Sequence, residues 1–248
     1  MAESSLNETA RSGYGRQSGA YVRGRPQYPA PAVEWVVAHL PGDGESVADI
    51  GAGTGALTMP LAERKIPVIA VEPVKAMIER CPAGPHRLRA AAGRLPFRNG
   101  ALSGIVAATA FHWFAATDVL REFHRCLVDD APMILLWNER DLRVPWVAEH
   151  NALVEPYAGD TPRFATMRWK AVVDAFPGFA EKAYAEFPNP SPTNRQGLVD
   201  RILSTSFIAA LSPAEREQVR QRAAALAGAL PQSFDYPYLT RIWCYRRR

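Results

Sequence analysis

The segment VADIGAGTG, residues 47–55, is a short apolar run with an acidic residue near its end, followed by glycine at every second position. Glycine at Gly51, Gly53 and Gly55 lets the backbone turn sharply and lets a ligand touch it, because no side chain stands in the way. A helix after this turn would present unpaired N–H groups to the same ligand. The pattern therefore predicts a β-strand that runs into a nucleotide-binding turn.

A second apolar run, PVIAVE at residues 67–72, ends in Glu72. A doubly wound sheet places there, about 20 residues after the glycines, the carboxylate that holds a ribose diol. The two runs together predict a cofactor that carries adenosine. The string GAGTGA also satisfies the dinucleotide pattern G-x-G-x-x-A, so a dinucleotide is an alternative, as is a plain turn without a ligand. Dinucleotide domains often open near the chain start, whereas this strand begins only at Val47.

Four segments share a pattern with one family: YVRGRPQYP (21–29), the two runs within 47–78, AGRLPFRNGALSGIVAATAFHWF (92–114), and STSFIAALSPAER with YPYLTRIW (204–216 and 236–243). They resemble the class I S-adenosylmethionine (SAM) dependent methyltransferases, and most closely the small-molecule branch of trans-aconitate methyltransferase-like proteins. The glycine turn is generic to the superfamily, whereas 21–29 and the triplet 112–114 are typical of that branch. The resemblance implies an α/β fold with a doubly wound, mostly parallel seven-stranded sheet (Rossmann-like), an antiparallel edge strand and a helical lid.

The apolar periodicity agrees with alternating strands and helices. Ser212, Pro213 and Glu215 predict the start of one helix, as N-cap, first helical residue and first-turn acid. We expect strands over 46–50, 67–72, 86–91, 104–110, 133–139, 182–187 and 239–246, and helices over 31–40, 54–65, 74–80, 118–127, 145–155, 165–175, 194–204 and 213–228.

Four regions are expected along the chain. Residues 1–30 would fold over the cofactor, and 31–139 would form the SAM-binding core. Residues 140–181, rich in Trp, Pro and Arg, would form a helical lid over the substrate. Residues 182–248 would complete the core sheet and carry inserted helices.

The resemblance assigns residues to the cofactor SAM, whose product is S-adenosylhomocysteine. Glu72 would accept hydrogen bonds from the ribose hydroxyls, and Asp49 would hold groups that bind the SAM ammonium or be purely structural. Arg25 could pair with the methionyl carboxylate. The remaining cofactor-binding candidates are Tyr21, Gly51, Ala52, Gly53, Pro73, Met77, Ala92 and Thr109.

Three departures from the family pattern stand beside these residues. Gly93 replaces a usual glutamate in AGRLPF, Ser103 replaces an aspartate before the fourth strand, and Asp129-Asp130 replaces a common turn. They make a non-catalytic SAM-fold binding or scaffold protein an alternative to an enzyme.

His112 is the catalytic candidate, because it follows the fourth strand, where the SAM methyl would point. It could deprotonate an acceptor hydroxyl, orient a carboxylate, or be structural. Substrate-binding candidates are Tyr14, Trp113 and Trp137. An acidic substrate would suit the arginines near the lid, and a phenol would suit its aromatic residues; the arginines are Arg140, Arg143, Arg163 and Arg168.

Charge, cysteine content and hydropathy argue against several other kinds of protein. The 248 residues carry a net charge of +4, scattered except for Arg246, Arg247 and Arg248 at the end, which argues against nucleic acid. An RNA-modifying methyltransferase stays an alternative. Three cysteines without a C-x-x-C pair predict neither a disulfide framework nor a metal site. No apolar stretch or signal sequence predicts a membrane partner, so a cytoplasmic monomer or homodimer acting on a small molecule is expected.

Overall fold

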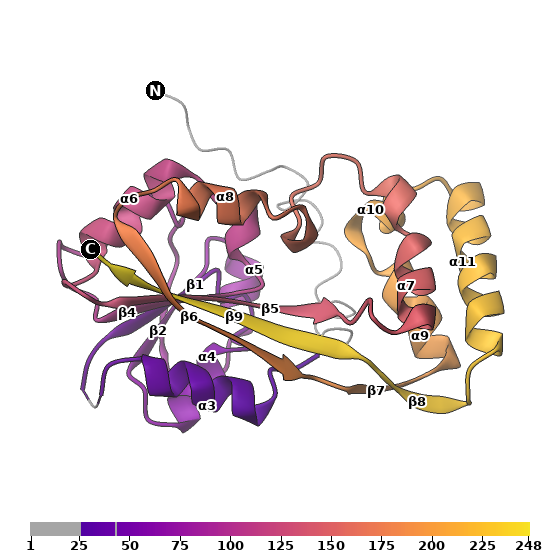
Figure 1. Ribbon diagram of the computed structural model, residues 1–248, viewed down its shortest axis with the longest axis horizontal. Coiled ribbons are helices and arrows are strands. Elements are labelled where there is room, and N and C mark those ends of the chain that lie inside the picture. The colour runs from indigo at the N-terminus through magenta and orange to yellow at the C-terminus, as the bar shows by residue number, and fades with distance from the viewer. Residues whose placement is uncertain (1–25, 43) are drawn as a thin grey trace.

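A computed structural model describes residues 26–42 and 44–248 (Figure 1). Its central sheet has seven strands in the order β3-β2-β1-β4-β5-β9-β6. The first five run parallel, and β9 pairs antiparallel with both β5 and β6. This confirms the predicted mostly parallel sheet with an antiparallel strand, and that strand, β9, lies between β5 and the edge strand β6. The strands are β1 (Val47–Ile50), β2 (Val68–Val71), β3 (His86–Leu88), β4 (Gly104–Ala108), β5 (Pro132–Arg140), β6 (Phe179–Pro188) and β9 (Tyr238–Arg247).

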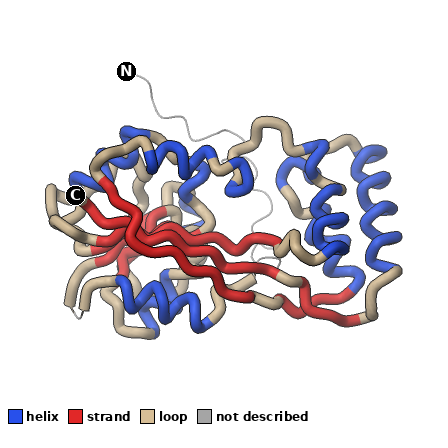
Figure 2. Tube along the Cα trace, in the orientation of Figure 1, coloured by secondary structure: helices blue, strands red, loops and turns tan. Residues whose placement is uncertain are grey.

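Helices cover both faces of this sheet, as Figures 1 and 2 show. Helices α3 (Ala30–His39) and α4 (Thr58–Glu63) pack on one face, where Val36 and Leu61 meet Val106 and Ile134. Helices α6 (Thr117–Cys126) and α8 (Arg168–Asp174) pack on the other. Because both faces are covered, every residue of β1 is buried, as a parallel sheet requires.

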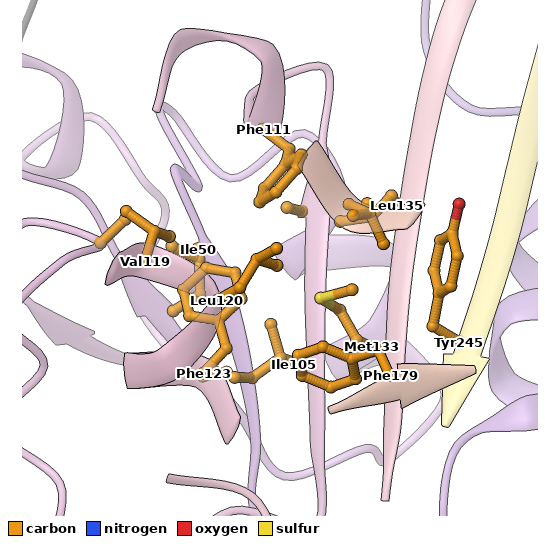
Figure 3. Packing of buried hydrophobic residues seen from close by; sticks show 14 of the residues in the cluster. Ile50, Ile105, Phe111, Val119, Leu120, Phe123, Met133, Leu135, Phe179 and Tyr245 are labelled. Carbon is orange, nitrogen blue, oxygen red and sulfur yellow. The ribbon is translucent and has the colours of Figure 1, made fainter. Parts of the chain in front are cut away.

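The face under α6 holds the largest hydrophobic cluster. Figure 3 shows Leu120 and Phe123 of α6 turned toward Ile105 of β4 and Met133 of β5. Helix α6 buries Val119, Leu120, Phe123 and Cys126, which recur at helical spacing along one side. This packing holds β4 in place, and His112 follows the carboxyl end of that strand.

A separate lobe lies beyond the carboxyl end of β5 (Figure 1). It combines α7 (Pro145–Ala152), α9 (Arg195–Leu203), α10 (Ser206–Ala209) and α11 (Pro213–Gly228) with a two-stranded antiparallel sheet, β7 (Ser191–Asn194) and β8 (Ser233–Tyr236). Its own cluster includes Val147, Ile202 and Val219. The predicted start of α11 is confirmed, since Ser212 and Glu215 form a reciprocal capping box.

The region 140–181 divides between two environments. Helix α7 packs in the lobe with α9 and α11. Two short 3-10 turns follow, η2 (Glu155–Tyr157) and η3 (Phe164–Thr166). From Phe164 onward the chain returns to the central sheet, where Phe164 and Trp169 join the cluster of Trp137 and Trp243.

Several element boundaries differ from the sequence prediction. The helix expected from Thr54 begins only at Thr58, because Gly55 has a positive φ angle of 87° that an α-helix cannot contain. Helix α5 (Lys75–Ile78) is one turn long. The strands β7 and β8 and helix α10 were not predicted.

Candidate functional site

The turn after β1 requires glycine at two positions. Gly51 has φ 74°, and a Cβ there would lie 2.6 Å from Ala110 Cβ. A Cβ on Gly55, with φ 87°, would lie 2.7 Å from Cys81 Sγ. A side chain at either position would meet both backbone strain and a steric clash. The sharp turn expected from VADIGAGTG is therefore present at the carboxyl end of β1, and we refer to residues 51–55 as the cradle.

The N–H groups of this turn are bonded to β2 and the residue after it. Gly51 N and Ala52 N donate to Val71 O at 2.8 and 3.1 Å, and Gly53 N donates to Glu72 Oε2 at 3.1 Å. The N–H groups expected to face a ligand were those of the helix after the turn. These three N–H groups of the turn itself are used to fix its shape.

Glu72 follows β2 with its carboxylate held on both sides. Oε1 accepts from Val74 N at 2.9 Å, Oε2 accepts from Gly53 N, and the residue is 7% exposed. Burial raises the pKa of Glu72, and the two N–H groups oppose that rise. Each carboxylate oxygen has a second lone pair, which can accept from a vicinal diol.

Asp49 on β1 is fully buried. Its Oδ2 accepts from Thr58 Oγ1 at 2.6 Å, while Oδ1 has no hydrogen-bond partner within 26–42 and 44–248. Burial, and secondarily the charge of Glu72, raises the pKa of Asp49 to about 7. A buried oxygen without a donor is costly, so Oδ1 is a place where a cationic ligand group would be stabilised. The sequence analysis did not single out Thr58.

Three further cofactor-binding candidates, Met77, Pro73 and Ala92, differ in their surroundings. Met77 of α5 is buried, and its Cε would be 3.2 Å from a Cβ on Gly53. Pro73 is half-buried next to Glu72. Ala92 is buried in the main hydrophobic cluster with Leu95. Met77 therefore approaches the glycine turn, whereas the Ala92 side chain packs inward.

The loop after Ala92 is fastened to α6 by two residues that the sequence analysis missed. Glu122 Oε1 accepts from Leu95 N at 2.7 Å and from Arg125 at 2.7 Å. Arg125 also donates to Phe97 O at 2.7 Å. Their i, i+3 spacing is a helix-pair signal, but a local pattern does not show that the pair holds a loop.

Thr109 has φ 52° directly after β4. Left-handed backbone is costly for a β-branched residue, and such strain concentrates at functional sites. Its N–H donates to Leu136 O at 2.7 Å, and its hydroxyl forms a 2.8 Å hydrogen bond with the hydroxyl of Tyr28. The strain turns the chain so that Ala110 meets Gly51 and His112 follows.

His112 lies in the 3-10 turn η1 (Phe111–Trp113) and is half-buried. Its Nδ1 accepts a hydrogen bond from Trp137 Nε1 at 3.0 Å. The ring of Trp113, also half-buried, is 5.0 Å from the imidazole between centroids. His112 and Trp113 therefore stand together at the end of β4.

The structure corrects one substrate candidate. Trp137 is fully buried, with ring centroids 4.3 Å from Trp169 and 5.1 Å from Phe164. Along β5 its side chain points to the same face as Met133 and Leu135, under η3 and α8, so it is packed in the hydrophobic cluster rather than exposed at a surface. Trp137 reaches the site only through His112.

Ser103, which replaces the aspartate usual in the family, lies away from the cradle. It precedes β4, so it is at the amino end of a strand that runs parallel to β1, and its hydroxyl donates to Glu45. Gly93 is exposed, and a Cβ there would make ordinary contact with Val119 at 3.7 Å. Neither replacement removes a contact of Asp49 or Glu72.

The arginines considered for an acidic substrate have partners. Arg143 pairs with Asp141 and Glu186. Arg163 pairs with Glu155, and Arg168 lies 3.7 Å from Asp160. Arg140 donates instead to the neutral amide oxygen of Asn151 at 2.7 Å. Tyr14, Tyr21 and Arg25 lie outside the described residues.

Comparison with known proteins agrees with this arrangement. A family model described as "Methyltransferase domain" matches residues 48–135. An uncharacterized methyltransferase of Mycobacterium tuberculosis is 35% identical over 144 residues, which cover 57% of this chain and 58% of that protein. An uncharacterized methyltransferase-like protein of Schizosaccharomyces pombe is 28% identical over 225 residues, 86% of this chain and 84% of that one. The chain thus spans less than two thirds of the mycobacterial relatives it matches.

Solved structures share the fold at low sequence identity. A putative type II methyltransferase from Anaeromyxobacter dehalogenans aligns with a TM-score of 0.65 at 20% identity, over 90% of this chain and 96% of that one. Geranyl diphosphate C-methyltransferase from Streptomyces coelicolor, solved with S-adenosylhomocysteine, gives 0.50 at 14% identity, over 88% and 76%. In the portion of the chain that the structure describes, no helix has the length and apolar character to cross a bilayer.

Proposed function

We propose that this chain, a class I SAM-dependent methyltransferase by its domain and fold, transfers a methyl group to an oxygen of a small-molecule acceptor. The observation that carries the proposal is the pair of buried carboxylates at the carboxyl ends of β1 and β2. Asp49 has an oxygen without a partner within the described ranges, and Glu72 is held with lone pairs to spare. One suits a cation and the other a diol, and SAM carries both groups.

The cradle supports the same cofactor. Gly51 lets the turn after β1 pack closely against Ala110, since a Cβ there would collide with it. Glu72 would accept from the ribose hydroxyls, and Asp49 would stabilise the α-ammonium group. Met77 and Pro73 would lie along the adenine, and Ala92 would lie near it. Ala52, Gly53 and Thr109 would shape the backbone around the methionyl part.

When bound, SAM supplies an electrophilic methyl group on a sulfonium. The protein's part in such a displacement is to hold the acceptor oxygen in line and to exclude water. His112 and Trp113 follow β4, the strand that neighbours β1, and can contact an acceptor there. The strained Thr109 fixes the direction in which this segment leaves the sheet.

A small acceptor is favoured by the lobe beyond β5. Its helices stand past the carboxyl end of the central sheet (Figure 2). The four arginines considered for an acidic substrate are paired with carboxylates or, for Arg140, hydrogen-bonded to a neutral amide, so these four give no specific support to a nucleic-acid partner. The five partner residues of these arginines, Asn151, Asp141, Glu186, Glu155 and Asp160, lie within the described ranges.

The test is transfer of a labelled methyl group from SAM to panels of carboxylic acids, phenols, amines and small RNAs, preceded by calorimetric titration with S-adenosylhomocysteine. Binding together with label in an oxygen compound supports the proposal. Label in RNA alone would establish the nucleic-acid alternative. Binding without transfer to any panel would favour a SAM-binding scaffold, and no heat at high micromolar ligand would overturn the proposal entirely.

A further inference from the structure

The hydrogen bond between Trp137 and His112 determines where the imidazole carries its proton. An indole N–H can only donate, so His112 Nδ1 must accept with its lone pair at the observed 3.0 Å. A ring nitrogen that accepts carries no hydrogen. The neutral imidazole then has its single proton on Nε2, and the doubly protonated imidazolium is incompatible with this contact.

The donor cannot easily turn away. Trp137 is fully buried and packed against Trp169, Phe164 and Trp243, with ring centroids 4.3, 5.1 and 5.8 Å away. Such a ring has no room to change its rotamer. A buried indole N–H also needs an acceptor, and His112 provides it. The other tautomer would bring two donors together and leave this N–H unsatisfied.

We propose that Trp137 is a positioning residue that fixes His112 as the Nε2–H tautomer, so that His112 acts as a hydrogen-bond donor rather than as a general base. The two ring nitrogens point in widely different directions, so Nε2 faces away from the indole. To remove a proton, Nε2 would need a lone pair, and the proton would have to move to Nδ1, where Trp137 N–H already points.

The consequence for methyl transfer rests on the proposed function. A donor at Nε2 orients an acceptor oxygen through one of its lone pairs and leaves another to attack. It does not activate a neutral hydroxyl by deprotonation. His112 therefore suits an acceptor oxygen that reaches the site already nucleophilic. The tautomer itself does not depend on any reaction and can be measured without substrate.

Long-range ¹H–¹⁵N correlation spectra of the full chain, labelled in its histidines, report the tautomer of each ring directly. The chain has five histidines, and the loss of signals in His112→Gln assigns those of His112. His150 is an internal reference, because its Nε2 faces Leu198 O at 3.1 Å and must carry the proton. We expect His112 to show the same pattern, with Nδ1 unprotonated. A protonated Nδ1 in the wild-type protein would overturn the proposal.

Two matched variants separate the hydrogen bond from packing. Trp137→Phe removes the donor but keeps an aromatic ring in the cluster. Trp169→Phe makes the same change in the same cluster, where the indole N–H has no hydrogen-bond partner within the described ranges. We expect a mixture of tautomers in Trp137→Phe and the wild-type pattern in Trp169→Phe. The wild-type pattern in both variants, or a mixture in both, would remove Trp137 from the role.

An activity measurement tests whether the Nε2–H donor of His112 takes part in methyl transfer. With any acceptor found in the transfer assay, Trp137→Phe should lower kcat at least several-fold more than Trp169→Phe. A changed tautomer with unchanged kcat would overturn the donor role of His112. If no acceptor is found, the proposed function fails, while the spectra still decide the tautomer.

Discussion

Gly53 N donates to Glu72 Oε2 at 3.1 Å, which joins the turn after β1 to the carboxylate after β2. The two sequence features that predict an adenosine cofactor are therefore bonded to each other. Because Val74 N holds the other oxygen, the carboxylate has a fixed orientation before any ligand arrives. Preorganisation of this kind lowers the entropic cost of binding.

The first prediction concerns Glu72. Glu72→Ala removes the proposed acceptor for the ribose hydroxyls, and the affinity for S-adenosylhomocysteine should fall at least about tenfold, since a hydrogen bond to a charged group contributes ~1.5–3 kcal/mol. Isothermal titration calorimetry measures the loss. Glu79→Ala is the control, because Glu79 is exposed and pairs only loosely with Lys75 at 3.7 Å. Equal affinities in wild type and Glu72→Ala would remove Glu72 from the site.

The second prediction concerns the protonation of Asp49. Its pKa is raised to about 7, mainly by burial, and an ammonium group prefers the ionised carboxylate. Below pH 7 binding must release a proton, so affinity for S-adenosylhomocysteine should fall by up to about tenfold per pH unit and level off above pH 7. Titrations between pH 5.5 and about 8 test this. Asp49→Asn should bind weakly with little pH dependence, and an unchanged slope in this variant would assign the proton to another group.

Patterns local in the sequence predicted the fold well. The strands alternate with helices at the expected places because parallel strands are short and fully apolar, as VIAV in β2 is. The capping box at Ser212 was readable because all of its partners lie within four residues. The sharp turn at Gly51 could be predicted because only glycine tolerates such a φ angle without strain.

Contacts between distant segments were not predictable. Asn138 and Asn189 donate to the backbone carbonyls of Pro26 and Gln27, and Thr240 donates to Asn138 Oδ1 at 2.6 Å. This network of β5, β9 and the segment after β6 has no local signature. The burial of Trp137 was not predictable for the same reason, since only tertiary packing tells whether an aromatic residue faces the core.

The third prediction concerns Gly51. Gly51→Ala combines a φ of 74° with a 2.6 Å approach to Ala110 Cβ, so the free energy of unfolding should fall by about 2 kcal/mol or more. Urea unfolding measures the change. Gly228→Ala is the matched control: a Cβ on Gly228, in α11, meets nothing within 4 Å, and alanine should stabilise this helix by up to about 1 kcal/mol. A Gly51→Ala protein as stable as wild type would contradict the tight turn.

The last prediction concerns His150 in the lobe beyond β5. It is fully buried, with Nδ1 3.0 Å from the hydroxyl of Tyr236 and Nε2 3.1 Å from Leu198 O. Burial first, and then the charges of Arg140 and Arg201, lower its pKa to about 3. Since the folded-state pKa lies below that of the unfolded chain, about 6.5, the stabilising effect of neutral His150 is complete above pH 6.5 and is lost as the pH falls toward 3.

While only the unfolded chain binds this proton, stability should fall by about 1.4 kcal/mol per pH unit from this residue. Urea unfolding at several pH values below neutral measures the slope, with the helical signal reporting on the lobe. His150→Gln should be less stable at pH 7 and should lose this part of the slope. The same slope in wild type and variant would show that other groups unfold the lobe in acid. A shallower slope in the variant would instead establish that a neutral His150, bonded to α9 and β8, holds α7 in the lobe.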